Sequence, residues 1–68
     1  MTNAIERMQR VRMIEAEVPS SDVPLKNFIA AQSLRHGLSR RTINEYLQTL
    51  IDADRAVLDG DMIRRQDV

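Results

Sequence analysis

The residues of this chain best suited to recognition chemistry lie between positions 39 and 48. Ser39 is followed directly by Arg40 and Arg41, and guanidinium groups bind phosphate oxygens and the acceptor edge of guanine in a bidentate geometry. The side-chain amides of Asn44 and Gln48 can donate and accept hydrogen bonds with adenine. The segment therefore carries residue types that contact phosphates and base edges in duplex DNA.

An apolar stripe predicts that this segment is a helix. The stripe has the offsets zero, three, four, seven and eight that mark one helical face. Because serine is a favoured N-cap, we expect a helix over 39–53 that Ser39 opens. The stripe consists of Ile43, Tyr46, Leu47, Leu50 and Ile51. The residues expected to point away from it are Arg41, Asn44, Glu45, Gln48 and Asp52.

Two earlier segments also have helical patterns. Residues 2–17 contain no glycine or proline and repeat apolar residues every three or four positions, which predicts an amphipathic first helix. A second helix should span 24–35, with Asp22 as its cap and Gly37 after its end.

A β-hairpin is expected after the third helix. Residues 56–64 are predicted to form two short strands around a type I′ turn at Asp59-Gly60, and Val23 could add a short edge strand.

The predicted fold class is mainly α with a small β-hairpin, as one domain over 1–68. The residues expected to be mostly buried are Ile5, Met8, Val11, Leu25, Phe28, Ile29, Leu38, Ile43, Leu47, Leu50, Val57 and Ile63.

The order of these elements resembles a three-helix winged helix-turn-helix, the DNA-binding superfamily of many small transcriptional regulators. The resemblance rests on Gly37-Leu38-Ser39 as the turn, on Arg41-Thr42-Ile43 with Tyr46, Leu47 and Leu50 as the recognition helix, on Ser33 four residues before the glycine, and on the hairpin as the wing. The pattern departs from the family at Gln32 and His36, where apolar residues are usual, and at Asp54, where glycine commonly ends the recognition helix.

The resemblance implies sequence-specific binding of double-stranded DNA and regulation of transcription. Base-facing roles are expected for Arg41, Asn44 and Gln48, and phosphate-facing roles for the turn and the wing. Independently of the resemblance, the apolar width of the first helix and the small core available to 68 residues lead us to expect a homodimer, or weak self-association, through that helix. Pairing would add contacts on a second half-site. The DNA-binding residues expected are Arg35, Ser39, Arg40, Arg41, Thr42, Asn44, Gln48, Arg64 and Arg65.

Charge leaves a second function open. The chain has 10 basic and 10 acidic residues, so only an uneven distribution can favour DNA. No acid occurs from Val23 to Asn44, but Glu45 and Asp52 lie on the face expected to meet DNA. A winged helix that assembles with protein partners instead of DNA is therefore the alternative.

Other classes of function find no support in the sequence. One histidine, no cysteine and no glycine-rich phosphate loop leave enzymatic chemistry without its usual residues, and we expect no cofactor. Asp52, Asp54, Asp59 and Asp61 do not have the ligand spacing of a calcium loop, because Ala56 stands at the third ligand position, so no metal is expected. The absence of cysteine and of a membrane-length apolar run leads us to expect a cytoplasmic protein without a membrane partner.

Overall fold

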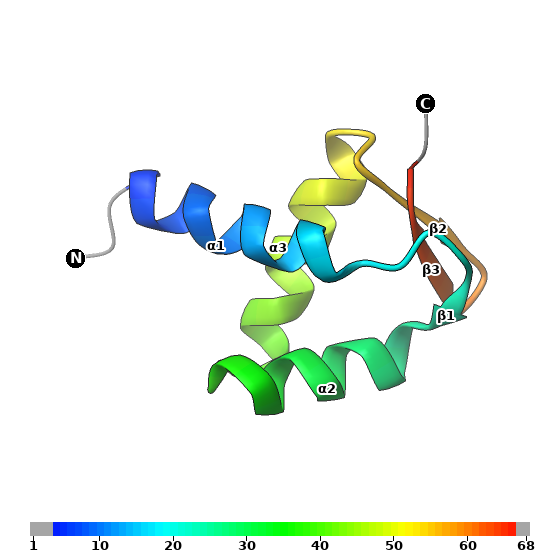
Figure 1. Cartoon of the computed structure of the whole chain (residues 1–68), viewed down its shortest axis with the longest axis horizontal. Coiled ribbons are helices and arrows are strands. Elements are labelled where there is room, and N and C mark those ends of the chain that lie inside the picture. The colour runs from blue at the N-terminus through cyan, green and yellow to red at the C-terminus, as the bar shows by residue number, and fades with distance from the viewer. Residues whose placement is uncertain (1–3, 67–68) are drawn as a thin grey trace.

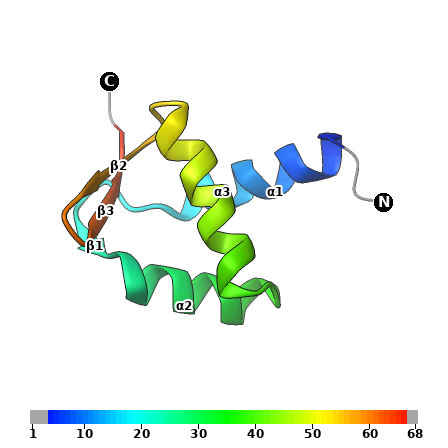
Figure 2. The ribbon, with the colours of Figure 1, turned by 180° about the vertical axis from the view of Figure 1, so that it is seen from behind.

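The computed structural model describes residues 4–66, which form three helices and a small three-stranded antiparallel sheet. Figures 1 and 2 show α1 and α2 on one side of α3, with the sheet at one end of the helices. The prediction of a mainly helical fold with a hairpin is confirmed; positions 2 and 3 of the first expected helix lie outside the described residues. The elements are α1 (Ala4–Glu17), β1 (Val23–Pro24), α2 (Leu25–His36), α3 (Arg40–Asp52), β2 (Ala56–Asp59) and β3 (Met62–Arg65).

The core forms around the inner face of α3, which packs against α1, α2 and β2. Six of the residues expected to be mostly buried are buried, and four others, Leu25, Ile29, Leu38 and Val57, are half-buried. The side chains that the apolar stripe of α3 predicted are thus those that hold the domain together. The buried apolar residues are Val11, Ile14, Val18, Phe28, Ile43, Tyr46, Leu47, Leu50, Ala56 and Ile63.

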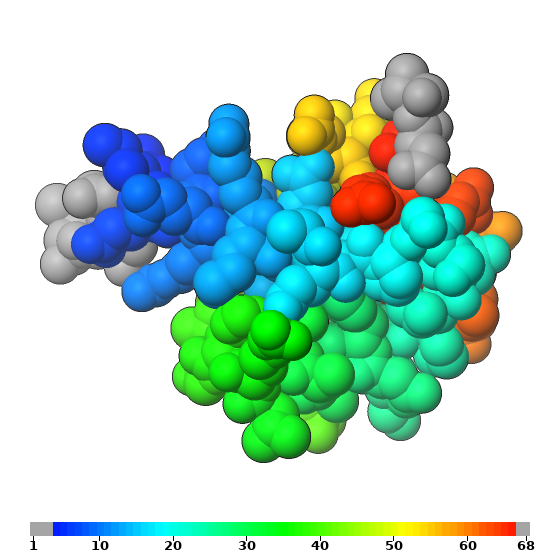
Figure 3. All heavy atoms as spheres, in the orientation of Figure 1, coloured from blue at the N-terminus to red at the C-terminus, as the bar shows by residue number. Residues whose placement is uncertain are grey.

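The expectation that Ile5 and Met8 are buried is wrong. Their exposed fractions are 70% and 50%, because the amino-terminal half of α1 extends past the rest of the domain (Figure 3). Val11 and Ile14 are the buried residues of α1. Helical periodicity identified a helix with apolar residues, but it could not show where along α1 the contact with α3 ends.

The start of α2 also differs from the prediction. Pro24 occupies the N-cap position without a side-chain cap hydrogen bond, and Asp22 is not the cap. The reason is that Val23 and Pro24 form β1, which pairs with β3 in the register Val23↔Ile63. The backbone N–H of Leu25 then donates to the carbonyl of Asp61 at 2.8 Å. The short edge strand at Val23 is confirmed, and it ties α2 to the hairpin.

The hairpin turns one residue later than expected and with a different geometry. Asp59 pairs with Met62, so the two loop residues are Gly60 and Asp61. Gly60 has a φ of +63°, whereas Asp61 does not have a positive φ. Type I′ turns need a positive φ at both loop residues, while type II′ turns need one only at the first, where glycine is preferred. The turn therefore has the pattern of type II′, and the prediction of a type I′ turn at Asp59-Gly60 is wrong.

Candidate nucleic-acid interface

The turn between α2 and α3 holds the first residues of the expected interface in place. Gly37 adopts a φ of +66° and donates its N–H to the carbonyl of Ser33 at 3.0 Å, which ends α2. The Ser33 hydroxyl donates to the carbonyl of Leu38. Ser39 caps α3 by accepting a hydrogen bond from the N–H of Thr42 at 3.1 Å. These bonds fix the direction in which α3 leaves the turn.

Ser39 and Thr42 are occupied with this cap. Their hydroxyl oxygens lie 2.9 Å apart, in addition to the backbone bond between the two residues. Thr42 is half-buried. Both residues therefore position α3, whereas the exposed side chains farther along the helix are available to a partner.

The outer face of α3 presents exposed side chains that are held by acids one turn later. The guanidinium of Arg41 lies 3.6 Å from the carboxylate of Glu45, and the amide nitrogen of Gln48 donates to the carboxylate of Asp52 at 3.0 Å. Such exposed pairs contribute only about 0.2–0.5 kcal/mol. Arg41 and Gln48 can therefore exchange these partners for others at small cost.

A hollow of about 400 Å³ lies between α2, α3 and the hairpin turn. Within residues 4–66, neither Lys26 nor Arg40 has an ion-pair partner, and both side chains are exposed beside Asn44. Lys26 was not among the expected DNA-binding residues, although the acid-free stretch from Val23 to Asn44 was the signal that could have identified it. The hollow is lined by Leu25, Lys26, Ile29, Arg40, Arg41, Asn44 and Asp61.

Arg35 does not line that hollow. Its Nε lies 3.0 Å from a carboxylate oxygen of Glu17, at the end of α1, and it borders a separate hollow with Phe28 and Gln32. Arg35 would have to leave Glu17 to bind a phosphate. Arg35 thus differs from Arg40, although both were expected to bind DNA.

Arg35 belongs to a polar cluster that joins the ends of α1 and α2. The Nε2 of His36 lies 2.9 Å from the Glu17 carboxylate and 3.1 Å from the Gln32 side-chain oxygen. Gln32 is only 6% exposed. The hydrogen bond from His36, supported by Gln32 and by the charge of Arg35, keeps the pKa of Glu17 below its ordinary value. Because these polar groups satisfy one another, Gln32 and His36 can stand where the winged-helix pattern has apolar residues.

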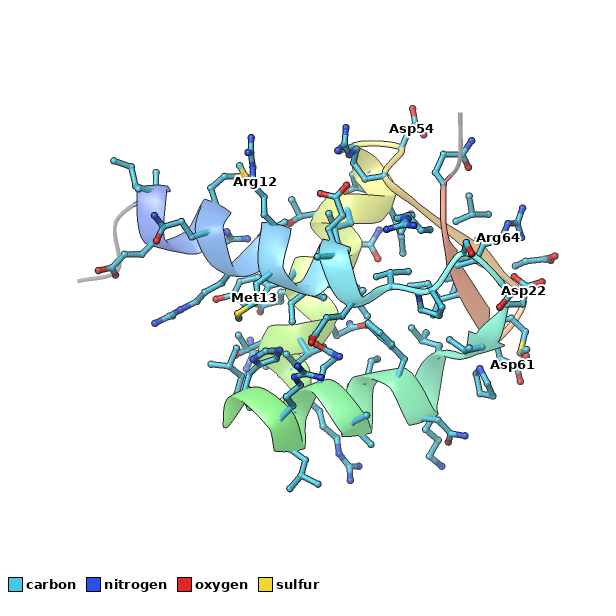
Figure 4. All side chains as sticks on the ribbon, in the orientation of Figure 1. Arg12, Met13, Asp22, Asp54, Asp61 and Arg64 are labelled. Carbon is cyan, nitrogen blue, oxygen red and sulfur yellow. The ribbon has the colours of Figure 1, made fainter. Side chains whose placement is uncertain are left out.

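The two arginines of β3 also lie outside the hollow at Arg40. Arg64 and Arg65 are adjacent in a strand, so their side chains leave opposite faces of the sheet. Arg64 donates to a carboxylate oxygen of Asp22 at 3.2 Å, and Figure 4 shows the two side chains beside each other. Arg65 is half-buried, and its backbone N–H donates to the carbonyl of Pro19 at 2.7 Å.

Two broader properties of the described residues bear on function. In residues 4–66 no group of three or more histidine, cysteine or acidic side chains could hold a metal ion. No helix of this part of the chain is both long and apolar enough to cross a membrane.

The chain matches no protein-family model, no curated protein and no solved structure.

Proposed function

We propose that this chain is a winged helix-turn-helix domain that binds double-stranded DNA, as a small cytoplasmic regulator of transcription. In this proposal α3 enters the major groove, which is wide enough to admit a helix, and Arg41, Asn44 and Gln48 face the bases. Lys26 and Arg40 bind the phosphates beside the start of α3. Arg35 and Arg64 contact phosphates only after leaving the carboxylates of Glu17 and Asp22. Arg65 does so only after leaving its half-buried position.

The observation that carries the proposal is the convergence at the start of α3. Lys26 from α2 and Arg40 from α3 border one hollow together with Asn44, and neither cation has an ion pair within residues 4–66. Positive charge at a helix N-terminus is unfavourable in isolation. Asp61 borders the same hollow but pairs with neither cation within residues 4–66, and a phosphate backbone would supply negative charge to both.

The test measures binding of fluorescent duplexes, first from a randomised pool and then as a single selected site, at about 50 mM and about 200 mM salt. Asn44→Ala should weaken binding to the selected site by about 1–3 kcal/mol and leave binding to random duplex nearly unchanged. Asn27→Ala is the matched control, because Asn27 is also an exposed helical asparagine but borders the hollow at Arg35. Absence of duplex binding at the lower salt would contradict the proposal.

We further propose that the domain pairs with a second copy through α1. The exposed side chains of Ile5 and Met8 border a shallow apolar hollow with Ala4, and their burial between two copies would remove apolar surface from water. Two domains on half-sites about one helical turn apart would bind DNA more tightly than one. Sedimentation should show dimers on a two-site duplex, and a strict monomer on that duplex would contradict pairing.

A protein-interaction module is the second candidate. Glu45 and Asp52 on the outer face of α3, together with Asp61 in the hollow, place negative charge where a phosphate backbone would approach. If duplex binding is absent at low salt, the same outer face becomes the surface to test against protein partners.

A further inference from the structure

A second hollow, of about 390 Å³, lies on the other flank of α3 and faces α1. The guanidinium of Arg7 stands 5.9 Å from the centre of the Tyr46 ring, within cation–π range. Arg10 borders the same hollow one turn later on α1. The hollow is lined by Ala4, Arg7, Arg10, Leu38, Thr42, Glu45 and Tyr46.

The two hollows lie on different sides of α3. Asn44 borders the hollow with α2, and Thr42 borders the hollow with α1. At about 100° per residue, these positions are separated by about 160° around the helix. The exposed face of α3 therefore lies between Lys26 and Arg40 on one side and the arginines of α1 on the other.

The charge at the hollow between α1 and α3 also favours binding of an anion. Arg7 and Arg10 are exposed, and within residues 4–66 neither forms an ion pair. Glu45 is the carboxylate that borders this hollow, beside two arginines, so the lining stays net positive even when Arg41 turns from Glu45 to a base. The contact with Tyr46 steadies Arg7 without neutralising its charge.

We propose that Arg7 and Arg10 form a second phosphate-binding surface, so that the domain holds both backbones that border one major groove. This inference rests on the proposed binding of DNA by α3. The major groove is about 12 Å wide, and a helix with its side chains is about 10–12 Å in diameter. A helix that fills the groove brings the cations on its two flanks toward two different phosphate strands. Lys26 and Arg40 bind one strand, and Arg7 and Arg10 bind the other.

Arg12 provides a matched control on the same helix. It lies about 140° from Arg7 and about 160° from Arg10 around α1. It borders the apolar hollow with Ile5 and Met8 instead of the hollow with α3, and Figure 4 shows it pointing away from α2. Arg12→Ala removes the same charge from the same helix at a face away from α3. Because that face is the one proposed for pairing, the comparison uses a duplex with a single half-site, to which a second copy adds no contact.

The experiment measures the slope of log affinity against log salt concentration for Arg7→Ala, Arg10→Ala and Arg12→Ala on one duplex with a single half-site. Each lost phosphate contact should reduce the slope by about 0.9, so Arg7→Ala and Arg10→Ala should each lower it by about one, and Arg12→Ala should leave it unchanged. Arg7→Lys should keep the slope, because it retains the charge. Thermal melting of each variant verifies that it is folded.

The outcomes separate the two proposals. If the unmodified domain binds the duplex but Arg7→Ala and Arg10→Ala behave like Arg12→Ala, the second surface is wrong and the proposed function stands. If the unmodified domain shows no salt-dependent affinity for duplex DNA, both proposals are wrong.

Discussion

The two faces of α3 differ in what their side chains contact. The inner face carries Ile43, Leu47 and Leu50, which are buried against the other elements of the domain. The outer face carries Arg41 and Gln48, which are exposed and contact acids of the same helix. Packing therefore determines the residue types on the inner face, whereas the fold places few demands on the outer face. The outer face is free to be adapted to a partner.

The largest effect is expected on the inner face. Leu47→Ala should lower the free energy of unfolding by about 2–5 kcal/mol, because Leu47 is 1% exposed and its truncation leaves a cavity in the core. Urea denaturation followed by circular dichroism measures this loss. A change below about 0.5 kcal/mol, the size usual for surface positions, would contradict the assignment of this face to the core.

On the outer face the expected effect is on binding and not on folding. Gln48→Ala should weaken binding to the selected duplex by about 1–3 kcal/mol while the free energy of unfolding changes by less than about 0.5 kcal/mol. Parallel anisotropy and denaturation experiments measure both quantities. A variant that loses stability but keeps its affinity would reverse the roles of the two faces.

A substitution in the cluster of Glu17, Gln32 and His36 tests whether polar contacts between α1 and α2 stabilise the fold, as the buried inner face of α3 does. The lowered pKa of Glu17 means that its ionised form stabilises the fold above the unfolded pKa of about 4.3 and that this contribution is lost as the pH falls through the folded value. Glu17→Gln should therefore be less stable than the unmodified domain at pH 7, and the difference should shrink below about pH 4. Denaturation at both pH values gives the comparison.

Asp54→Asn is the control for charge alone. Asp54 is exposed after α3 with a φ of +59°, which asparagine tolerates. A Glu17→Gln difference that stays constant with pH, or that Asp54→Asn reproduces, would show that the contact with His36 is unimportant.

The smallest effect is expected at Asp52. Its carboxylate accepts a hydrogen bond from Gln48 and so holds the amide that is proposed to face a base. Asp52→Ala and Asp52→Asn remove the same charge, but asparagine can still accept this hydrogen bond. Discrimination between selected and random duplex should fall by about twofold in Asp52→Ala and less in Asp52→Asn, as expected from the few tenths of a kcal/mol of an exposed helix pair. Equal discrimination in both variants would show that Asp52 contributes charge alone.

Sequence patterns predicted α3 most accurately. Ser39 is its N-cap, Gly37 ends α2 with a positive φ, and Asp54 follows α3 in the left-handed region that glycine would favour. These are local features, because each depends on a few neighbouring residues and their backbone angles. The expected buried positions of α3 were correct for the same reason: helical periodicity is a local property.

Predictions that depended on distant partners were less accurate. Met8 has the periodicity of a buried residue, yet no other described element covers it sufficiently. Asp22 was expected to cap α2 but instead binds Arg64, which is 42 positions away. Arg35 and Arg40 were both expected to bind DNA, but Arg35 pairs with Glu17, whereas Arg40 borders a hollow with Lys26. The side of an element to which a residue turns can be read from periodicity, but what lies on that side cannot.

The sequence by itself determined the three helices, the caps of α3, the hairpin and the inner face of α3, because propensity, capping and periodicity act over a few residues. Only the tertiary structure decided which cations are neutralised and which remain exposed. Arg64 is held by Asp22, while Lys26 and Arg40 border a hollow from different helices. The physical reason is that an ion pair depends on a distance of a few ångströms between groups, and chain folding sets that distance for residues far apart in sequence.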